Sequence, residues 1–507
     1  MADPWSSSEP RTAPTVPGPA SQPPADPWAG ASYEPVSPLA TPTAAVPPAP
    51  ARRRWFVPLA VVTAVLAVVV FTTVVFWPFG RGADAPLPFR PITEIGRVTF
   101  EGEGARPSLT FLTGDQLYAA AEVGENLEVV AADLATGAVR WRTVVAGEVG
   151  HGWVWLLANP TVVLAYADPY PAAMAGTLVA LDVAGGAELW RRDLYHEDVI
   201  LLRESTLTVH ASHERRLVGL DLTTGDEVWE VTRTSDDAFH DGADVHGVQV
   251  AADLAEPSDP RGGPTVRHGT AVVVVAPDRS ARLVEFATGE ETWRRGNVAS
   301  PADFVYVYEN WLYVADGAAG YRLLAYDLTD AEAQPRTLYT VEDVTRNPVT
   351  SPQRCGEERL CLLDRVGRAE ETTEVLAIDI GDEPRLAWRA PAPRARHLVA
   401  VGDLVIVNGG TRPLVAYDRT GAEVFDRTAG RGVRLNAGNA LLLGDELSPF
   451  FADLSLLGYA VAERQLVALD TARGVNGTGC SWRVVDGVGY VVCPTGEAVV
   501  IWRITEA

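Results

Sequence analysis

One short pattern recurs along most of this chain and restricts its fold more than any other feature: Ala-x-Asp-x-x-Thr-Gly-x-x-x-Trp. It is complete in AADLATGAVRW, nearly complete in ALDVAGGAELW and GLDLTTGDEVW, and present as LVEFATGEETW with Glu285 in place of Asp. Weaker copies continue to LVALDTARG near the C-terminus. The Asp and Trp residues of the copies are Asp133, Trp141, Asp182, Trp190, Asp221, Trp229, Trp293, Asp327, Asp379, Trp388, Asp418 and Asp470. Most copies lie about 40 to 50 residues apart, a period typical of propeller blades.

Each part of the pattern has a structural reason. The apolar residues before the Asp form a short strand, and the Asp accepts backbone N–H groups across the following turn. The Gly supplies positive φ for a tight hairpin, and the Trp lies on the returning strand, where it wedges against the next unit. One or two further apolar runs precede each copy. We therefore expect an all-β propeller of four-stranded blades.

The number of copies predicts the number of blades. Eight copies predict eight blades, with seven and nine as the alternatives. The C-terminal run EAVVIWRI has the pattern of one more third strand. The segment GRVTFEG, which starts at Gly96, is expected to pair beside it and close the ring.

These repeats resemble the PQQ-type β-propeller repeat family, whose signature is the same motif. The resemblance covers residues 96–507 and implies that the motif Asp and Trp residues are blade-to-blade docking elements, not catalysts. In the BamB branch of the family the propellers are protein-docking scaffolds. The family's enzymes are quinoprotein dehydrogenases, which hold PQQ with a calcium ion and typically carry an adjacent Cys-Cys pair that this chain lacks.

The N-terminal part differs in composition from the repeats. Residues 1–54 are crowded with Pro, Ala and Ser, so we expect a disordered tail. The run from Trp55 to Trp77 has 23 residues without a charge and would rise about 34 Å as a helix, enough to cross a bilayer core of about 30 Å. Three arginines precede it, which places the tail in the cytoplasm. A cleaved signal peptide is the alternative, but the apolar run is too long for one.

The resulting segments are a disordered Pro/Ala-rich cytoplasmic tail (1–54), a transmembrane helix (55–77), a linker (78–95) and an extracytoplasmic propeller (96–507).

Charge and cysteines agree with this arrangement. The formal net charge is −24, all of it outside the tail, and such a surface repels nucleic acid. All 42 basic residues are arginines. The four cysteines form two close pairs, Cys355 with Cys361 and Cys480 with Cys493, which favours local disulfides in an exported domain. A zinc site is the alternative, but neither pair has the two-residue spacing or nearby histidines.

The longest insertion separates Asp221 from Glu285 and is rich in acidic residues. Its carboxylates and imidazoles are candidate ligands for a divalent ion, although no calcium-loop spacing is met and a solvated acidic loop is the alternative. The candidates are Asp236, Asp237, His240, Asp241, Asp244 and His246.

A second candidate is HGWVWLLANP, where Trp153 and Trp155 would lie on one face of a strand. Two aromatic rings could grip a sugar or a quinone, but alternating Trp residues are more typical of a core. No nucleophile elbow and no Gly-rich phosphate loop is present, so no catalytic residue is assigned.

Three functions remain. The leading hypothesis is a non-catalytic, membrane-anchored propeller that binds a protein or another envelope ligand, and it expects no cofactor. The alternatives are a PQQ- and calcium-dependent dehydrogenase and a single-pass envelope sensor. ADPW occurs at Ala2–Trp5 and again at Ala25–Trp28, so a cytoplasmic docking partner for the tail is also expected.

Overall fold

The structure is a computed structural model. It describes residues 87–147, 151–169, 175–195, 198–202, 206–211, 214, 216–232, 245–247, 265–267, 271–285, 287–301, 303–308, 310–316, 320–350, 352–356, 358–367, 369–408, 414–427, 431–436, 438–444, 452–475 and 479–505. All of these residues belong to one compact unit, Val75–Ala507.

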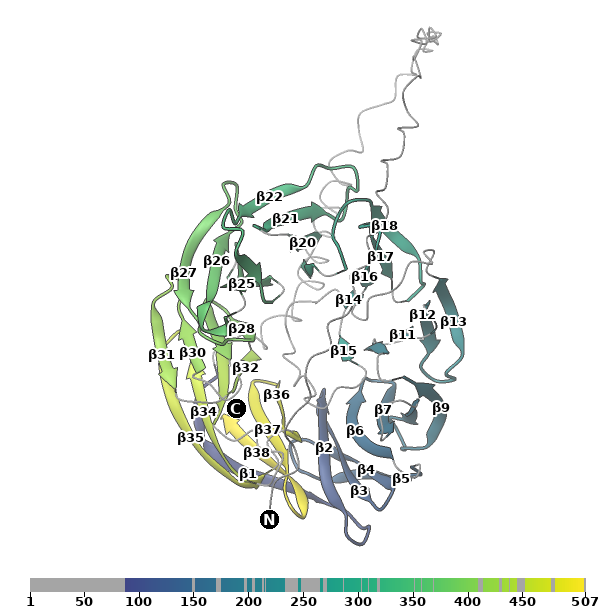
Figure 1. Cartoon of the computed structure of the whole chain (residues 1–507). Helices are drawn as coiled ribbons and strands as arrows, with labels where there is room; N and C mark the ends of the chain where they lie inside the picture. Colours follow the sequence, from purple (N-terminus) through teal and green to yellow (C-terminus); the bar gives the residue numbers. More distant parts are fainter. Residues whose placement is uncertain are drawn as a thin grey trace, which may run out of the picture. The chain divides into compact units, whose positions relative to one another are not determined.

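The described residues form nine antiparallel blades arranged in a ring (Figure 1). In most blades, strands that follow one another in the chain pair with one another, so the first strand is innermost and the fourth is outermost. Two exceptions are blade 3, where β15 (Thr265–Arg267) pairs on the inner side of β10 (Val199–Leu202), and blade 9, whose outer strand comes from the N-terminal end of the propeller. The predicted all-β propeller of four-stranded blades is confirmed. The predicted number of eight blades is wrong, because the ring has nine.

Blades 1 to 3 follow in chain order from Arg106. Blade 1 comprises β2 (Arg106–Thr113), β3 (Gln116–Val123), β4 (Asn126–Asp133) and β5 (Val139–Val145). Blade 2 comprises β6 (His151–Ala158), β7 (Val162–Pro169), β8 (Gly176–Asp182) and β9 (Glu188–Leu194). Blade 3 comprises β10 (Val199–Leu202), β11 (Thr206–Ala211), β12 (Arg216–Asp221) and β13 (Glu227–Thr232).

Blades 4 to 6 depart from the simple four-strand order. Blade 4 comprises β14 (Val245–Gly247), β16 (Ala271–Val275), β17 (Ala281–Glu285) and β18 (Glu291–Arg295), whereas β15 (Thr265–Arg267) pairs in parallel with β10 of blade 3. Blade 5 comprises β19 (Phe304–Tyr308), β20 (Trp311–Asp316), β21 (Arg322–Asp327) and β22 (Arg336–Thr340). Blade 6 comprises β23 (Arg346–Pro348), β24 (Gln353–Arg354), β25 (Arg359–Val366), β26 (Thr373–Asp379) and β27 (Arg385–Pro391), with a short 3-10 helix η1 (Glu370–Thr372) before β26.

Blades 7 to 9 complete the ring. Blade 7 comprises β28 (His397–Val401), β29 (Leu404–Asn408), β30 (Leu414–Tyr417) and β31 (Glu423–Arg427). Blade 8 comprises β32 (Arg431–Asn436), β33 (Asn439–Leu443), β34 (Ala452–Ala460) and β35 (Gln465–Val475). Blade 9 comprises β36 (Ser481–Val485), β37 (Val488–Pro494), β38 (Ala498–Thr505) and, from the other end of the propeller, β1 (Phe89–Thr99).

The ring is closed by an N-terminal strand. β1 pairs antiparallel with β38, so that Arg97 faces Val500 and Val98 faces Val499 in the register. The predicted pairing of GRVTFEG beside EAVVIWRI is confirmed over Gly96 to Thr99. β1 begins at Phe89, inside the range that the sequence analysis gave to a linker.

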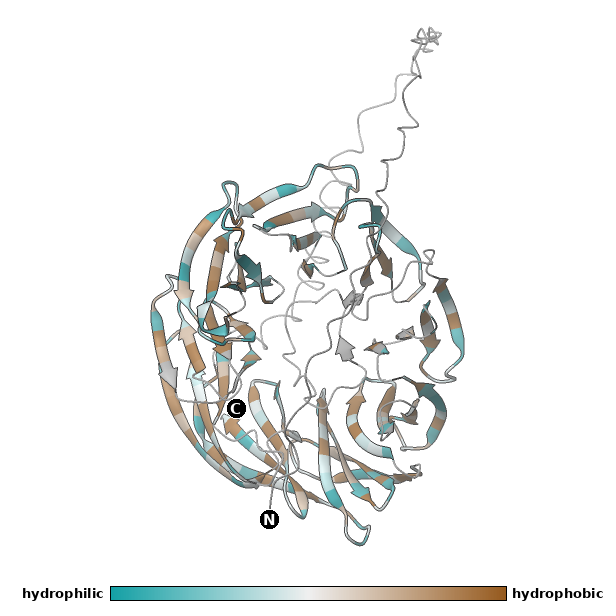
Figure 2. Cartoon of the chain, viewed as in Figure 1, coloured by the Kyte–Doolittle hydropathy of each residue, from teal (hydrophilic) through white to brown (hydrophobic). Residues whose placement is uncertain are grey.

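The core is divided among the seams between blades. Nine clusters of buried apolar side chains are found among the described residues, one at each seam of the ring. Alternate residues of one strand enter different clusters: in β3, Leu117 packs toward blade 9 and Tyr118 toward blade 2. Figure 2 shows the apolar residues concentrated on the middle strands, with more hydrophilic residues on the outer ones. Each blade is therefore buried on both faces by its neighbours.

Both predicted disulfides are confirmed. Cys355 is bonded to Cys361 and Cys480 to Cys493, and all four residues are buried. Each disulfide joins the first two strands of a blade, in blade 6 and blade 9. Both bonds therefore stiffen the inner part of the ring.

The predicted tail and membrane helix, residues 1–77, lie outside the described residues. Within the described part of the chain, no helix has the length and apolar character needed to cross a membrane.

Candidate functional site

The motif residues build one end of the ring. In most copies the Asp stands at the end of the third strand of its blade, and its carboxylate accepts hydrogen bonds from the turn that follows: Asp133 Oδ1 accepts Thr136 N at 2.9 Å and Thr136 Oγ1 at 2.7 Å. Asp221 accepts Thr223 N and Oγ1 in the same way. The hydroxyl bond from Thr136 lowers the pKa of Asp133, and the bond from Thr223 lowers that of Asp221.

The motif Trp joins one blade to the next. Its indole donates to a backbone carbonyl in the neighbouring turn: Trp141 Nε1 to Val183 O and Trp190 Nε1 to Leu222 O, both at 2.8 Å. Trp293 and Trp388 do the same with Asp327 O and Arg419 O. The motif Gly of the next blade lies against the indole, and a Cβ on Gly186 would stand 2.5 Å from the side chain of Trp141. The φ of Gly186 is also positive, at +72°. Both the lack of space and the backbone conformation therefore require glycine at this position.

Five of the nine seams have a motif Trp and four lack it; two of these four show which residues make the contact instead. Arg336 of blade 5 donates to Gly381 O of blade 6. At the closing seam Gly96 meets Gly137, where a Cβ on Gly96 would stand 3.0 Å from the Cα of Gly137. At these two seams, as at the Trp seams, a residue of an outer strand therefore contacts the turn of the next blade.

One copy of the motif lies elsewhere in its blade. Asp470 lies within β35, the outer strand of blade 8, opposite Leu456 of β34. The turn between these strands is Val461–Arg464, so LVALDTARG is a fourth strand and not a third. The apolar run before Asp470 mimics the motif, but no Thr-Gly turn follows it.

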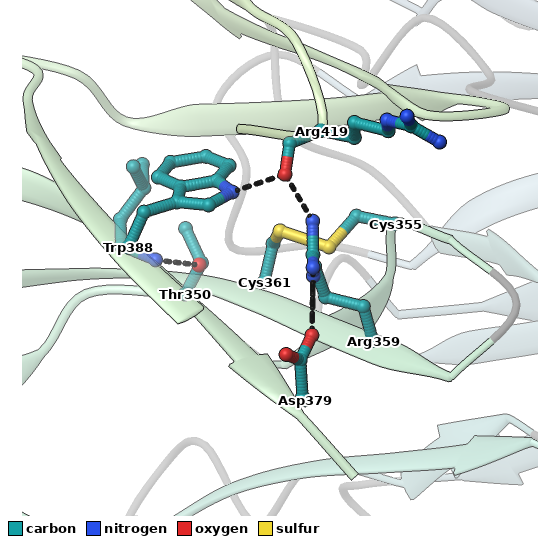
Figure 3. Close-up of a disulfide and its surroundings, with 8 residues drawn as sticks. Thr350, Cys355, Arg359, Cys361, Asp379, Trp388 and Arg419 are labelled. Atoms are coloured by element: carbon teal, nitrogen blue, oxygen red, sulfur yellow. Dashed lines mark hydrogen bonds and ion pairs between the residues drawn. A yellow bond between two sulfur atoms is a disulfide. The ribbon is translucent and has the colours of Figure 1, made fainter. Parts of the chain in front are cut away.

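Blades 6 and 7 place a charged hollow at the turn end of the ring. It is lined by Arg359, Asp379, Arg385, Trp388 and Arg419. Arg359 Nε donates to Asp379 Oδ1 at 2.8 Å, and Arg385 Nε stands 3.6 Å from the other carboxylate oxygen. The disulfide Cys355–Cys361 closes the hairpin that carries Arg359 (Figure 3).

The backbone of Arg419 is held from two sides. Its carbonyl oxygen accepts Trp388 Nε1 at 3.0 Å and also accepts the guanidinium of Arg359 (Figure 3). The preceding Asp418 accepts Thr420 N at 2.8 Å and Thr420 Oγ1 at 2.6 Å. The side chain of Arg419 points away from these contacts, so a rigid turn presents an exposed guanidinium.

A second hollow lies on the other side of this turn, between blades 7 and 8. Its lining includes Asp403, Asp418, Arg419, Tyr459 and Arg464. Arg464 pairs with Asp418 at 3.1 Å. Arg419 thus stands between two hollows that carry charges of both signs.

A buried polar network joins blades 5 and 6. Asp364 is fully buried and accepts Arg346 NH1 at 2.8 Å and Tyr321 Oη at 3.2 Å. Arg346 also contacts Glu374 at 2.7 Å. Burial raises the pKa of Asp364, although the two guanidinium groups of Arg346 and Arg389 oppose it. The charged groups pair with one another within the network, so we interpret it as a structural element of the seam between blades 5 and 6.

The two candidate sites from the sequence have different outcomes. Asp236, Asp237, His240, Asp241 and Asp244 lie outside the described residues, and of His246 only the backbone, in β14, is described. No group of three or more metal-ligating side chains is found in the part of the chain that the structure describes.

Trp153 and Trp155 are both buried, as a core role requires, but they do not share a face. A bulge between them turns Trp153 toward blade 1 and Trp155 toward blade 3. The expected aromatic pair on one strand face is therefore wrong.

The family comparison agrees with this geometry. Residues 125–254, which contain three motif copies, match the family described as outer membrane protein assembly factor BamB. The matched residues are about a quarter of the chain and are similar to that family. The chain shows no significant match among curated proteins.

Solved structures show distant similarities to this chain. BamB from Moraxella catarrhalis is 12% identical with a TM-score of 0.41, covering 82% of this chain and 98% of that chain. The computationally designed Ika8 protein is 12% identical with a TM-score of 0.37, covering 81% and 99%. The C-terminal WD40 domain of Sif2 is 8% identical with a TM-score of 0.39, covering 82% and 99%. At these scores none of the three carries an argument about function.

Proposed function

We propose that the protein is a membrane-anchored, extracytoplasmic scaffold that binds a protein partner without catalysing a reaction. In this proposal residues 55–77 span the cell membrane, the tail lies in the cytoplasm, and the propeller faces outward. The family match over residues 125–254 supports the scaffold role, since the family is described as an assembly factor.

The observation that carries the proposal is the turn at Arg419 with a hollow on each side. Small-molecule sites are mostly apolar and enclosed. Here the hollow between blades 6 and 7 is lined mainly by charged and polar groups, with Arg385 77% exposed, and the hollow between blades 7 and 8 adds apolar residues to its charges. The backbone of Arg419 between them is held by Trp388 and Arg359. A rigid, polar surface with arginine at its centre is typical of a protein-docking site, because arginine and tryptophan dominate the binding energy of such interfaces.

Site-specific crosslinking tests the docking face. A photo-crosslinking amino acid in place of Arg419, in the full chain and in the producing cell, is expected to form adducts with one or a few defined proteins. The same replacement at Arg294, an exposed residue of an outer strand in blade 4, is the matched control. Equal adducts at both positions, or none at Arg419, would count against the proposal.

A cofactor titration separates the scaffold from a dehydrogenase. Thermal unfolding of the full chain is measured with PQQ, with and without Ca²⁺. The scaffold proposal expects no shift at PQQ concentrations well above micromolar. A calcium-dependent stabilisation with a changed quinone spectrum would favour the dehydrogenase instead.

The proposed location in the cell membrane is tested by fractionation. The full chain is expected in the membrane pellet after alkaline washing, and external protease is expected to reach the propeller but not the tail. Release of the whole chain by the alkaline wash would contradict the anchor.

A further inference from the structure

Carboxylates are absent from the innermost strands of the ring. The ten strands that begin the blades are β2, β6, β10, β14, β19, β23, β24, β28, β32 and β36, and none contains Asp or Glu. The same strands contain six arginines and three histidines. This is the reverse of the whole chain, which has 66 acidic and 42 basic residues.

The outer strands show that the difference belongs to the position in the ring. They mix carboxylates with arginines, as in ELWRRDL of β9 and EVFDR of β31. Outer arginines mostly pair with neighbouring carboxylates: Arg191 with Glu188 at 2.6 Å and Arg294 with Glu291 at 2.5 Å. The inner strands have no such partners within the same strand.

The arginines of these first strands lie in blades 6, 8, 9 and 1, and the first strand of blade 7 has none. They are Arg346, Arg354, Arg431, Arg434, Arg483 and Arg106, and the second strand of blade 6 adds Arg365. We call this set the arginine arc.

Some arginines of the arc already have hydrogen-bond or ion-pair partners within the protein. Arg346 is neutralised by Asp364 and Glu374, and Arg483 donates to Leu112 O across the closing seam at 3.3 Å. Glu122 faces Arg106 in the register of β2 and β3, but no ion pair joins them in the described structure.

Three members have unused donors. The Nε atoms of Arg365 and Arg434 are buried and have no hydrogen-bond partner among the described residues. Arg106 is exposed at the start of β2. A buried guanidinium N–H without an acceptor destabilises the protein, so an anion that reaches these groups would recover that loss.

The extent of the arc indicates the shape of its ligand. A compact anion would touch one or two arginines, whereas the arc has members in four of the nine blades. An extended chain with repeated carboxylates can meet several guanidinium groups at once, with the bidentate geometry that arginine favours. The net charge of −24 opposes the approach of any polyanion, so the test below compares an acidic peptide with a nucleic acid of the same length.

We propose that the arginine arc on the inner edge of the ring binds an acidic peptide segment. This site is separate from the docking face at Arg419, so either proposal can fail alone.

The test uses the full chain in detergent and a fluorescein-labelled deca-glutamate peptide. The net charge alone predicts repulsion of this probe, so saturable binding in fluorescence anisotropy would show a local basic site. The variant Arg106→Gln/Arg365→Gln/Arg434→Gln is expected to weaken binding at least about tenfold. The control Arg97→Gln/Arg294→Gln/Arg473→Gln removes the same charge from outer strands and is expected to bind like the wild type.

Four results would overturn the proposal: no binding of deca-glutamate, equal loss in both triple variants, tighter binding of a thymidine decanucleotide, or displacement of the peptide by citrate at equal carboxylate concentration. If the inner triple variant does not fold, Arg106→Gln alone replaces it. This residue is exposed, so its substitution should leave the midpoint of thermal unfolding nearly unchanged. Wild-type affinity in this variant would then also count against the arc.

Discussion

At the residue scale, the stability of a seam depends on whether the indole N–H has a hydrogen-bond acceptor across it. Trp190 and Trp155 lie in the same cluster between blades 2 and 3 and are 9% and 8% exposed. Trp190 Nε1 donates to Leu222 O, whereas Trp155 Nε1 is buried without a partner and its ring stacks on Tyr166 with centroids 5.2 Å apart. A comparison of the two residues therefore separates the contribution of indole packing to stability from that of the indole hydrogen bond.

We predict that Trp190→Phe destabilises the protein more than Trp155→Phe. Both changes remove similar volume, but only Trp190→Phe leaves a carbonyl without its donor, and the difference in free energy of unfolding should be about 1 kcal/mol. Urea unfolding of the full chain measures both variants. Equal losses would mean that the indole bond across the seam contributes nothing.

Two buried carboxylates predict opposite responses to pH. Glu128 is 1% exposed; burial acts to raise its pKa, but the N–H groups of Glu101 and Gly102 and the guanidinium of Arg142 hold the pKa below its usual value. Its stabilising effect is present above the unfolded pKa and lost as the pH falls through the folded one. Asp364 has a raised pKa, so its effect is present at acid pH and lost as the pH rises through the folded value.

We therefore predict that Glu128→Gln costs more at pH 7 than at about pH 4, and that Asp364→Asn costs less at pH 7 than at about pH 4. Thermal unfolding of both variants and the wild type over this range checks the two slopes. Parallel slopes would show that neighbouring groups, not these two carboxylates, control the dependence.

At the element scale, the unit of construction is the hairpin between the third and fourth strands. In each motif hairpin the register shifts shortly before the turn, as between Ala131 and Ala132 in blade 1 and between Ala180 and Leu181 in blade 2. This shared bulge increases the twist and re-aims the outer strand. The repetition of the motif in the sequence is the repetition of this hairpin.

Strand identity was predictable where a turn marked it and failed where none did. The motif copies located seven third strands, four of them with a Thr-Gly turn, while LVALD at Asp470 has the same apolar pattern on a fourth strand. The bulge between Trp153 and Trp155 was also invisible, because alternation in the sequence assumes a regular pleat. For Asp470 and for the two tryptophans, the pairing with neighbouring strands, and not the local sequence pattern, determines where the residue lies.

The disulfides act on single elements, and their effects should follow the loops they close. Cys355–Cys361 spans 6 residues and Cys480–Cys493 spans 13. We predict that replacing the first pair with alanine costs about 2 kcal/mol and the second about 3 kcal/mol, because the longer loop gains more freedom in the unfolded chain. Thermal unfolding measures both, and thiol labelling of the unfolded wild type without reductant should find no free cysteine. An equal or reversed order would show that native packing outweighs loop entropy.

At the scale of the whole molecule, the sequence revealed the repeat but not the number of its copies in the ring. The motif spans the third and fourth strands of one blade, and in blade 9 these are β38 and β1, from opposite ends of the propeller. No contiguous motif can exist there. The arginine arc was equally hidden, because only the ring topology brings the first strands of nine blades to one edge.

The closing strand provides the sharpest test of the nine-bladed ring. Val98 is fully buried in the cluster between blades 9 and 1, whereas Arg97 beside it is half exposed and pairs with Glu94. Because β1 is the only described strand of blade 9 that comes from the N-terminal side, disrupting it should open the ring at one seam.

Val98→Asp would bury an unpaired charge and is expected to cost about 3–5 kcal/mol, whereas Arg97→Gln should stay within about 0.5 kcal/mol. Urea unfolding gives the free energies, and hydrogen exchange locates the change. In Val98→Asp, protection should fall first in β1, β38 and blade 1, because β1 joins blades 9 and 1. Unchanged protection there, with a loss of stability spread evenly over the blades, would mean that the ring does not depend on this strand for closure.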